Sequence, residues 1–271
     1  MRTLGVPGGA RGVLFSVNGS EPPALRTIEA LASPQSDAMR DRWLLGLVCC
    51  ALFTEAGAVL AELRRRGLRP RSVPTGPARG AWTCAVDGAT VGVVVSGRGH
   101  AAAAGAAGFW VPRSRALVLC EVLRPTAAVG GTTLALDGDT DLIAAIGAHA
   151  ARGGIDIRPG RVATVAEVEL GPSARQSLAA AGYSAAGPEV DAWRAAASAA
   201  RVPFAACAAL LDGAGADTVD LAPGLAGPPW WRPAVLMVRP EARARARRAD
   251  DAVREAANAA AGASVAALLG P

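Results

Sequence analysis

The stretch LLGLVCCALFTEAGAVLAELRRR, from Leu44 to Arg66, carries the clearest structural signal in the chain. Its first part, Leu44 to Ala51, is a continuous apolar run, typical of a strand buried on both faces of a parallel sheet. From Glu55 to Arg66, apolar residues recur at helical spacing, with arginines in the last turn and Gly67 as a stop. The pattern predicts a strand, a turn and a helix.

Predicted strands and helices continue to alternate along the rest of the chain. Asp87-Gly88, between two of the strands, is a strong hairpin signal. Further predicted strands are Ala81–Val86, Thr90–Val95, Leu117–Leu123, Gly160–Val168 and Val202–Leu211. One predicted helix follows Gly99 and ends near Phe109. The other predicted helices are Asp141–Arg152, Pro188–Ala200 and Pro240–Leu269. We therefore expect one α/β domain over residues 43–271, with a central mixed, largely parallel sheet flanked by helices. Residues 1–42 are interpreted as an N-terminal extension.

The composition is that of a globular protein, with 51% hydrophobic and 19% charged residues among 271. All 28 basic residues are arginines, which we interpret as the codon bias of a GC-rich bacterial genome. The net charge is +5, but the densest basic cluster, Arg239 to Arg248, is followed at once by Asp250 and Asp251. This favours a solvated helix face over an anion or partner surface, so no nucleic-acid partner is expected.

The five cysteines include no CxxC pair and no His–Cys cluster, so we expect no metal site. Residues 1–12 lack the apolar segment of a secretory leader, and reduced thiols in a cytoplasmic protein are the expectation. The longest apolar run, Leu44 to Phe53, is too short to span a bilayer.

Three segments carry residues suited to chemistry. Glu55 begins a helix directly after a buried strand, where ligands of open α/β sheets bind, and a carboxylate there can deprotonate a water. The alternative is that Glu55 only complements the positive end of the helix.

The second segment, Ser96-Gly97-Arg98-Gly99, lies between a predicted strand and a helix. Its glycines allow close approach of a ligand, and a helix N-terminus favours anions. A tight strand–helix turn without a ligand is the alternative, and the pattern lacks the third glycine of a dinucleotide site.

The third segment joins Glu189, at the start of a helix, to Asp212, at the end of the next buried strand. Paired acids with separate roles suit general acid chemistry together with binding of sugar hydroxyls. A helix-terminal charge and a loop-capping aspartate are the alternative.

Together these segments resemble the methylthioadenosine/S-adenosylhomocysteine nucleosidases of the nucleoside phosphorylase and nucleosidase superfamily. The resemblance covers about residues 43–217 and rests on order and spacing. Ala51-Leu52-Phe53-Thr54-Glu55 looks like their A-(L/M)-x-x-E turn, Val95 to Ala103 (VSGRGHAAA) resembles their S-G-I-G-x-x-A-A-A segment, Glu189 falls at their M-E glutamate, Val202-Pro203-Phe204 matches V-P-F, and Asp212 matches their S-D aspartate.

The resemblance implies a role for each residue. Glu55 would activate a water, Glu189 would hydrogen-bond the ribose hydroxyls, and Asp212 would help to protonate the purine. Ser96, Gly97, Arg98, Arg124 and Val168 would contact the substrate, with Val168 near the place of an aromatic that stacks on the base. The resemblance further implies a nucleoside-like small molecule, no cofactor and a homo-oligomer.

The chain departs from this family in several places. The family's G-x-A-G-G-L loop, which lines the ribose and nucleophile site, should follow Leu123, where the sequence instead reads Arg124-Pro125-Thr126. Pro188 replaces the family's methionine, Leu211 its serine, and Ala208 a common arginine. These changes indicate an altered substrate or a fold without hydrolysis.

We therefore predict an N-ribosyl hydrolase acting on a purine-like nucleoside or thionucleoside. A phosphorylase is the first alternative, with Arg98 or Arg124 supplying the anion site. A non-hydrolytic ligand-binding or biosynthetic member of the same fold is the second, and an unrelated α/β protein is the third. Trp230-Trp231 is either a lid, an oligomer contact or a packed loop anchor.

Overall fold

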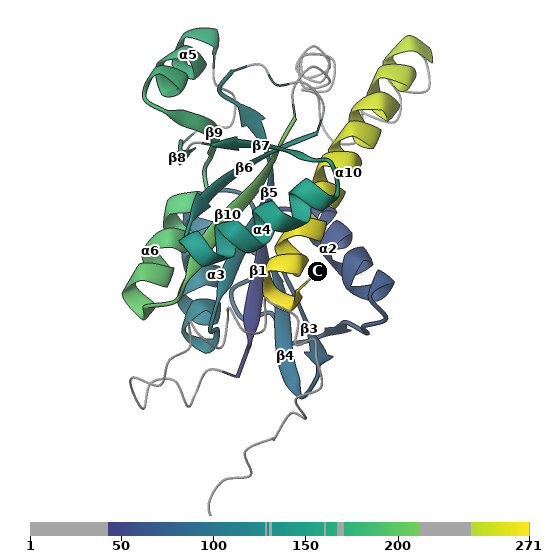
Figure 1. Cartoon of the computed structure of the whole chain (residues 1–271), viewed down its shortest axis with the longest axis vertical. Helices are drawn as coiled ribbons and strands as arrows, with labels where there is room; N and C mark the ends of the chain where they lie inside the picture. The colour runs from purple at the N-terminus through teal and green to yellow at the C-terminus, as the bar shows by residue number, and fades with distance from the viewer. Residues whose placement is uncertain are drawn as a thin grey trace, which may run out of the picture.

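The computed structural model describes residues 43–127, 129, 132–159, 161–166, 171–211 and 240–270 (Figure 1). The N-terminal extension, Val168, Asp212 and Trp230-Trp231 lie outside these residues. The predicted first strand is β1 (Gly46–Cys50), and it lies at the centre of the sheet. The predicted helix after it is α2 (Phe53–Arg65).

The sheet has a parallel centre with antiparallel additions. The strands β4 (Ala89–Val95) and β5 (Leu117–Pro125) flank β1, and β10 (Phe204–Leu210) pairs with β5, all in parallel. The order β2-β3-β4-β1-β5-β10-β6-β7 is completed by β2 (Arg71–Ser72), β3 (Gly80–Val86), β6 (Thr133–Gly138) and β7 (Asp156–Pro159). The mixed, largely parallel sheet predicted from the sequence is confirmed.

The predicted hairpin is the β3–β4 pair. Asp87 and Gly88 both have positive φ, at 46° and 83°, as a two-residue turn of this kind requires. Residues 69–80, between α2 and the hairpin, contain β2 and the first residue of β3.

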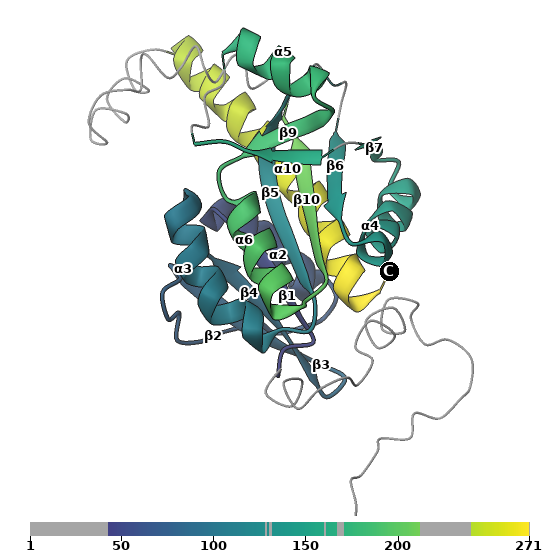
Figure 2. The same ribbon diagram turned by 90° about the vertical axis from the view of Figure 1, so that its left-hand side faces the viewer.

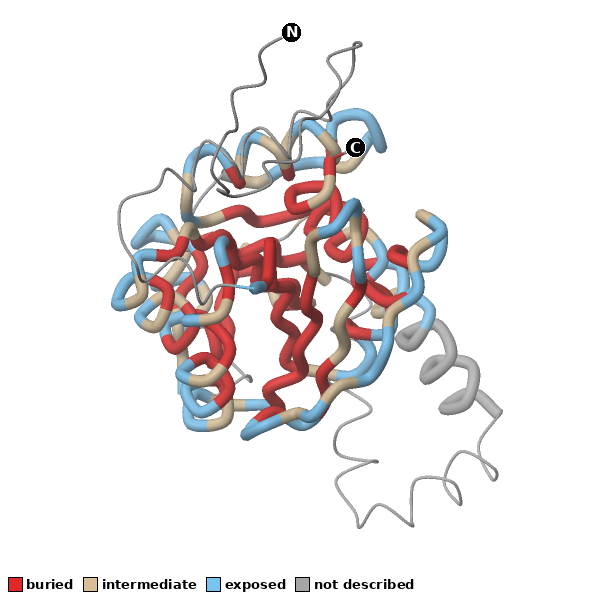
Figure 3. Tube along the Cα trace, turned by 90° about the horizontal axis from the view of Figure 1, so that it is seen from below, coloured by how far each residue is buried: buried red, intermediate tan, exposed pale blue. Residues whose placement is uncertain are grey.

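Helices cover both faces of the sheet (Figure 2). One face packs against α2, α4 (Thr140–Arg152) and α10 (Pro240–Leu269). The other packs against α3 (His100–Trp110), α6 (Val190–Ala200) and the short 3₁₀ helix η2 (Val111–Arg113). Buried residues follow the central strands, whereas exposed residues lie on the outer helices and turns (Figure 3).

Strand β5 is long enough to reach a second, smaller group of strands. Its last residues pair in antiparallel with β9 (Tyr183–Gly187), which pairs in parallel with β8 (Arg161–Thr164). The helix α5 (Pro172–Ala180) precedes β9. This arrangement matters for function because β9 leads directly to Glu189.

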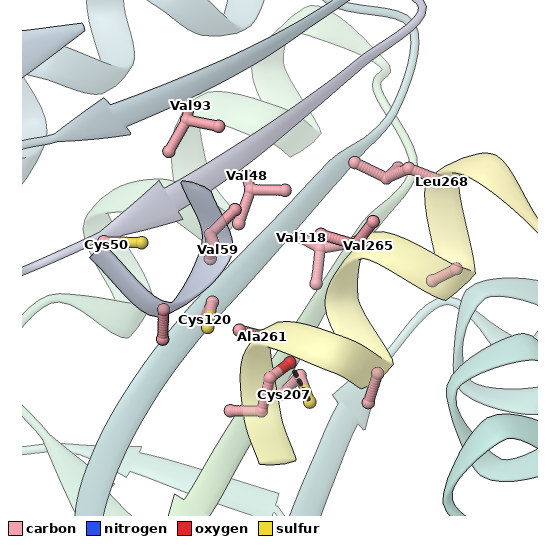
Figure 4. Packing of buried hydrophobic residues seen from close by; sticks show 14 of the residues in the cluster. Val48, Cys50, Val59, Val93, Val118, Cys120, Cys207, Ala261, Val265 and Leu268 are labelled. Carbon is pink, nitrogen blue, oxygen red and sulfur yellow. Dashed lines mark hydrogen bonds between the residues drawn. The ribbon is translucent and has the colours of Figure 1, made fainter. Parts of the chain in front are cut away.

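All five cysteines are buried free thiols. Three of them, Cys50, Cys120 and Cys207, occupy the neighbouring strands β1, β5 and β10 in the core beneath α2 and α10 (Figure 4). Within the described ranges, no helix is both long and apolar enough to cross a membrane. The same residues contain no group of His, Cys, Asp and Glu arranged to hold a metal ion.

Candidate active site

Three glutamates lie together where the strands of the parallel centre end. Glu55 follows β1, Glu121 lies within β5, and Glu189 follows β9. Each is only 2% exposed to solvent, and charge interactions couple all three. Burial of a carboxylate is costly unless it is hydrogen-bonded or keeps its proton, so the surroundings of each side chain decide what it can do.

Glu55 links the β1–α2 turn to β5. Its Oε2 atom accepts hydrogen bonds from the backbone N–H groups of Ala51 and Leu52, at 3.0 and 2.8 Å. Its Oε1 atom accepts from the N–H of Val122 at 3.0 Å. The helix-terminal role considered from the sequence is therefore present in the structure. The three bonds leave Oε1 one lone pair for a further donor.

The environment of Glu55 also changes its acidity. Burial raises the pKa of Glu55 from 4.5 to about 7, and the charge of Glu189 acts in the same direction. The hydrogen bonds from Val122, Leu52 and Ala51 favour the ionised form and offset part of this rise. A carboxylate with a pKa near neutrality is suited to accept a proton during catalysis.

Glu189 joins two helix N-termini. It is the N-cap residue of α6, and its Oε1 atom accepts a 2.7 Å hydrogen bond from the N–H of Gly99, the N-cap residue of α3. Burial raises the pKa of Glu189, whereas the N–H of Gly99, its own N–H and the Arg98 guanidinium lower it. The structure thus brings Glu189 to the predicted Ser96–Gly99 segment.

The Ser96–Gly99 segment forms the tight strand–helix turn that was considered from the sequence. Gly97 and Gly99 have φ values of 90° and 94°, a conformation that favours glycine. The buried Ser96 hydroxyl donates to the Gly97 carbonyl at 2.9 Å, while Arg98 is exposed. A Cβ atom added to Gly97 would lie 2.6 Å from Nε of Arg79, so this arginine, which sequence reasoning missed, lies against the turn.

Glu121 was also missed. Alternation along β5 places it on the same face as Leu117, Leu119 and Leu123, which pack in the layer formed with α3 and α6. Burial raises the pKa of Glu121, and the charges of Glu189 and Glu55 raise it further. The sequence signal that could have identified Glu121 is a single acid inside the apolar run LVLCEVL. An acidic residue in a buried strand is a candidate for a functional role.

The remaining predicted residues have other outcomes. Arg124 is partly buried near the end of β5, opposite Ala186 of β9 in the antiparallel register. Val168 and Asp212 lie outside the described residues, so their substrate and catalytic roles stay predictions. The structure therefore brings Glu55 and Glu189 together and adds Glu121.

Comparison with known proteins identifies the class of fold. The sequence matches no family model and no curated protein. Solved structures, however, resemble it at low sequence identity, and they include hydrolases of nucleosides. The chain has a nucleoside phosphorylase/nucleosidase-like fold, as its motifs predicted.

Three solved structures illustrate the likeness. A Helicobacter pylori methylthioadenosine/S-adenosylhomocysteine nucleosidase variant with 5′-methylthioadenosine in its active site has a TM-score of 0.61 and 11% identity, covering 82% of this chain and 96% of its own. The Helicobacter pylori futalosine hydrolase has a TM-score of 0.60 and 11% identity over the same shares. The Neisseria meningitidis methylthioadenosine/S-adenosylhomocysteine nucleosidase bound to methylthio-immucillin-A has a TM-score of 0.59 and 15% identity, covering 83% and 98%.

Proposed function

We propose that this chain is an N-ribosyl hydrolase that cleaves the glycosidic bond of a purine-like nucleoside or thionucleoside. The observation that carries the proposal is the pair of buried, charge-coupled glutamates, Glu55 and Glu189, in a nucleosidase-like fold. Assembly into a homo-oligomer and a cytoplasmic location are further predictions.

In the proposed reaction, Glu55 accepts a proton from a water as the water oxygen bonds to the anomeric carbon. The bond from that carbon to the base nitrogen breaks, and Asp212 helps to deliver a proton to the departing base. Glu189 binds the ribose hydroxyls. The negative charges of the site stabilise the positive charge that develops on the sugar.

The acidity of Glu55 supports this role. With a pKa of about 7, a substantial fraction of Glu55 is ionised at neutral pH, while the group remains basic enough to take a proton. General acid–base help of this kind is typically worth about 10²–10⁴-fold in rate.

A phosphorylase is the second candidate, and the position of Arg79 favours it. Arg79 lies against Gly97, and the exposed Arg98 interacts with Glu189, so two guanidinium groups border the turn before α3. Phosphate binds readily to arginines beside a helix N-terminus. The charges of Glu55 and Glu189 would repel the anion, which favours water as the nucleophile.

The test is chromatographic detection of free base from purine nucleosides, methylthioadenosine and S-adenosylhomocysteine, with and without phosphate. Release without phosphate, lost in both Glu55→Gln and Asp212→Asn, supports the hydrolase. Glu62→Gln is the matched control, since Glu62 is a second buried glutamate of α2 that pairs with Arg66. Release only with phosphate would establish the phosphorylase. No release from any substrate would reject both and favour a non-hydrolytic protein.

A further inference from the structure

Glu121 has a free hydrogen-bonding group deep inside the protein. Its Oε1 atom is buried and has no hydrogen-bond partner among the residues that the structure describes. Its Oε2 atom lies next to Gly187, where an added Cβ atom would come within 3.3 Å of it. Buried polar atoms are rarely left without a partner, so an unpaired carboxyl oxygen in a candidate active site calls for a functional explanation.

The groups that face Glu121 are acidic or neutral. Glu189 from the start of α6 and Glu55 from α2 raise its pKa by their charge, and the Cys120 thiol on β5 does so more weakly. The thiol of Cys49 on β1 is also close enough to interact with it. Across the β5–β10 register, Glu121 lies opposite Ala208, which carries no charge. The described surroundings thus offer Glu121 no counter-ion, and burial together with the two neighbouring charges favours its protonated form.

A protonated carboxyl group is a hydrogen-bond donor, which none of the ionised acids of the site can be. Glu121 and Glu55 flank one peptide group, because the N–H that follows Glu121 in the chain, that of Val122, donates to Oε1 of Glu55. This is the oxygen of Glu55 that retains a free lone pair. The two carboxyl groups also interact through their charges, and a water between them would accept from Glu121 and donate to Glu55.

We propose that Glu121 is a positioning residue of this site and donates a hydrogen bond from its free carboxyl oxygen to the water that Glu55 activates. The proposal rests on the hydrolase function above. The water gives one proton to Glu55, accepts the Glu121 hydrogen on one lone pair and directs its second lone pair at the anomeric carbon. Glu121 ends the step with its own proton.

The first test needs no activity. Infrared spectra of the protein with ¹³C-labelled glutamate are compared at neutral pH for the wild type, Glu121→Gln, Glu55→Gln and Glu62→Gln. We expect a carbonyl band of a protonated carboxyl group that disappears in Glu121→Gln, shifts in Glu55→Gln and is unchanged in Glu62→Gln. Absence of a band assignable to Glu121, or a band that Glu55→Gln leaves unmoved, would overturn the proposal.

The second test measures base release by Glu121→Gln and Glu121→Met. The amide of glutamine can still donate to the water, so we expect its kcat to fall less than about 10-fold, whereas methionine loses about 10²-fold or more with little change in KM. Equal kcat values for the two variants would contradict the proposal. If the wild type releases no base, the hydrolase function fails and the positioning role fails with it, whereas the infrared comparison still reports separately whether Glu121 is protonated and coupled to Glu55.

Discussion

The backbone N–H of Val122 donates a 3.0 Å hydrogen bond to Oε1 of Glu55, although the two residues are 67 positions apart in sequence. Strand β1 ends at Cys50, and the carboxylate of Glu55 extends the hydrogen-bonding pattern of β5 beyond that end. The same side chain also caps the first turn of α2. Because these bonds fix its orientation, Glu55 can hold a water in one place.

The rate of base release should depend on the ionisation of Glu55. Only the ionised carboxylate accepts a proton, and the pKa of Glu55 is about 7. We expect kcat/KM to rise with pH up to about 7 and then to level off. A profile that is already flat between pH 5 and 7 would contradict Glu55 as the base. The measurement is a series of initial rates at constant ionic strength.

Glu55 should also make folding stability depend on pH. Because its pKa is raised from 4.5 to about 7, the folded state binds more protons than the unfolded state between these values. The contribution of Glu55 to stability is therefore largest below about pH 4.5 and falls as pH rises to about 7. One pKa unit corresponds to about 1.4 kcal/mol, so the difference between wild type and Glu55→Gln should change by roughly 3 kcal/mol across this window. Urea unfolding at several pH values measures it, and parallel pH curves for the two proteins would refute it.

Glu189 should govern recognition of ribose hydroxyls. In Glu189→Gln the charge is lost, and hydrogen bonds to charged groups contribute about 1.5–3 kcal/mol. We expect KM for a ribonucleoside to rise roughly 10- to 100-fold, with a much smaller change for the matching 2′-deoxynucleoside. Steady-state kinetics on the substrate pair tests this, and equal effects on both would remove Glu189 from sugar binding.

Gly187 should be intolerant of a side chain. A Cβ atom there would lie 2.9 Å from Cδ2 of Leu123 and 3.3 Å from Oε2 of Glu121. We expect Gly187→Ala to destabilise the protein by about 1–3 kcal/mol. Gly57→Ala is the control, because Gly57 lies in α2 with open space around it, and alanine there should stabilise by about 0.5–1 kcal/mol. Thermal unfolding compares them, and similar effects would count against the tight packing.

Replacing Glu121 by methionine should separate stability from activity. The substitution removes a buried carboxyl group whose Oε1 atom has no partner among the described residues, and an unsatisfied atom of this kind costs about 1–3 kcal/mol. We expect Glu121→Met to be more stable than the wild type by a similar amount, although it turns over substrate more slowly. A less stable variant at pH 8, measured by urea unfolding, would show that the carboxyl group supports the fold.

Long apolar runs made much of the fold predictable. The strand and helix around Leu44–Arg66 were located within a few residues, and the Asp87-Gly88 turn was identified from its chemistry. Strands β2, β6, β7 and β9 and the helix α5 were missed. The sequence of β9, Tyr183 to Gly187, is mostly alanine and glycine, so pairing with β5 and β8 stabilises it rather than its own propensity.

The candidate site was only partly predictable for a different reason. Glu55 and Glu189 could be found because each stands at the start of a predicted helix. Glu121 lies within a strand, and its importance depends on which strands lie beside β5, which local patterns do not reveal. Arg79 lies outside every sequence motif. The β3–β4 pairing places it against the turn at Gly97.

The row of cysteines in Figure 4 gives the protein built-in reporters of its own opening. Cys50, Cys120 and Cys207 are completely shielded, on three adjacent strands of the parallel centre. A thiol reagent can modify them only when those strands separate from the helices above. The speed of such labelling in native buffer therefore measures how often the sheet beneath the glutamates is exposed, without any denaturant.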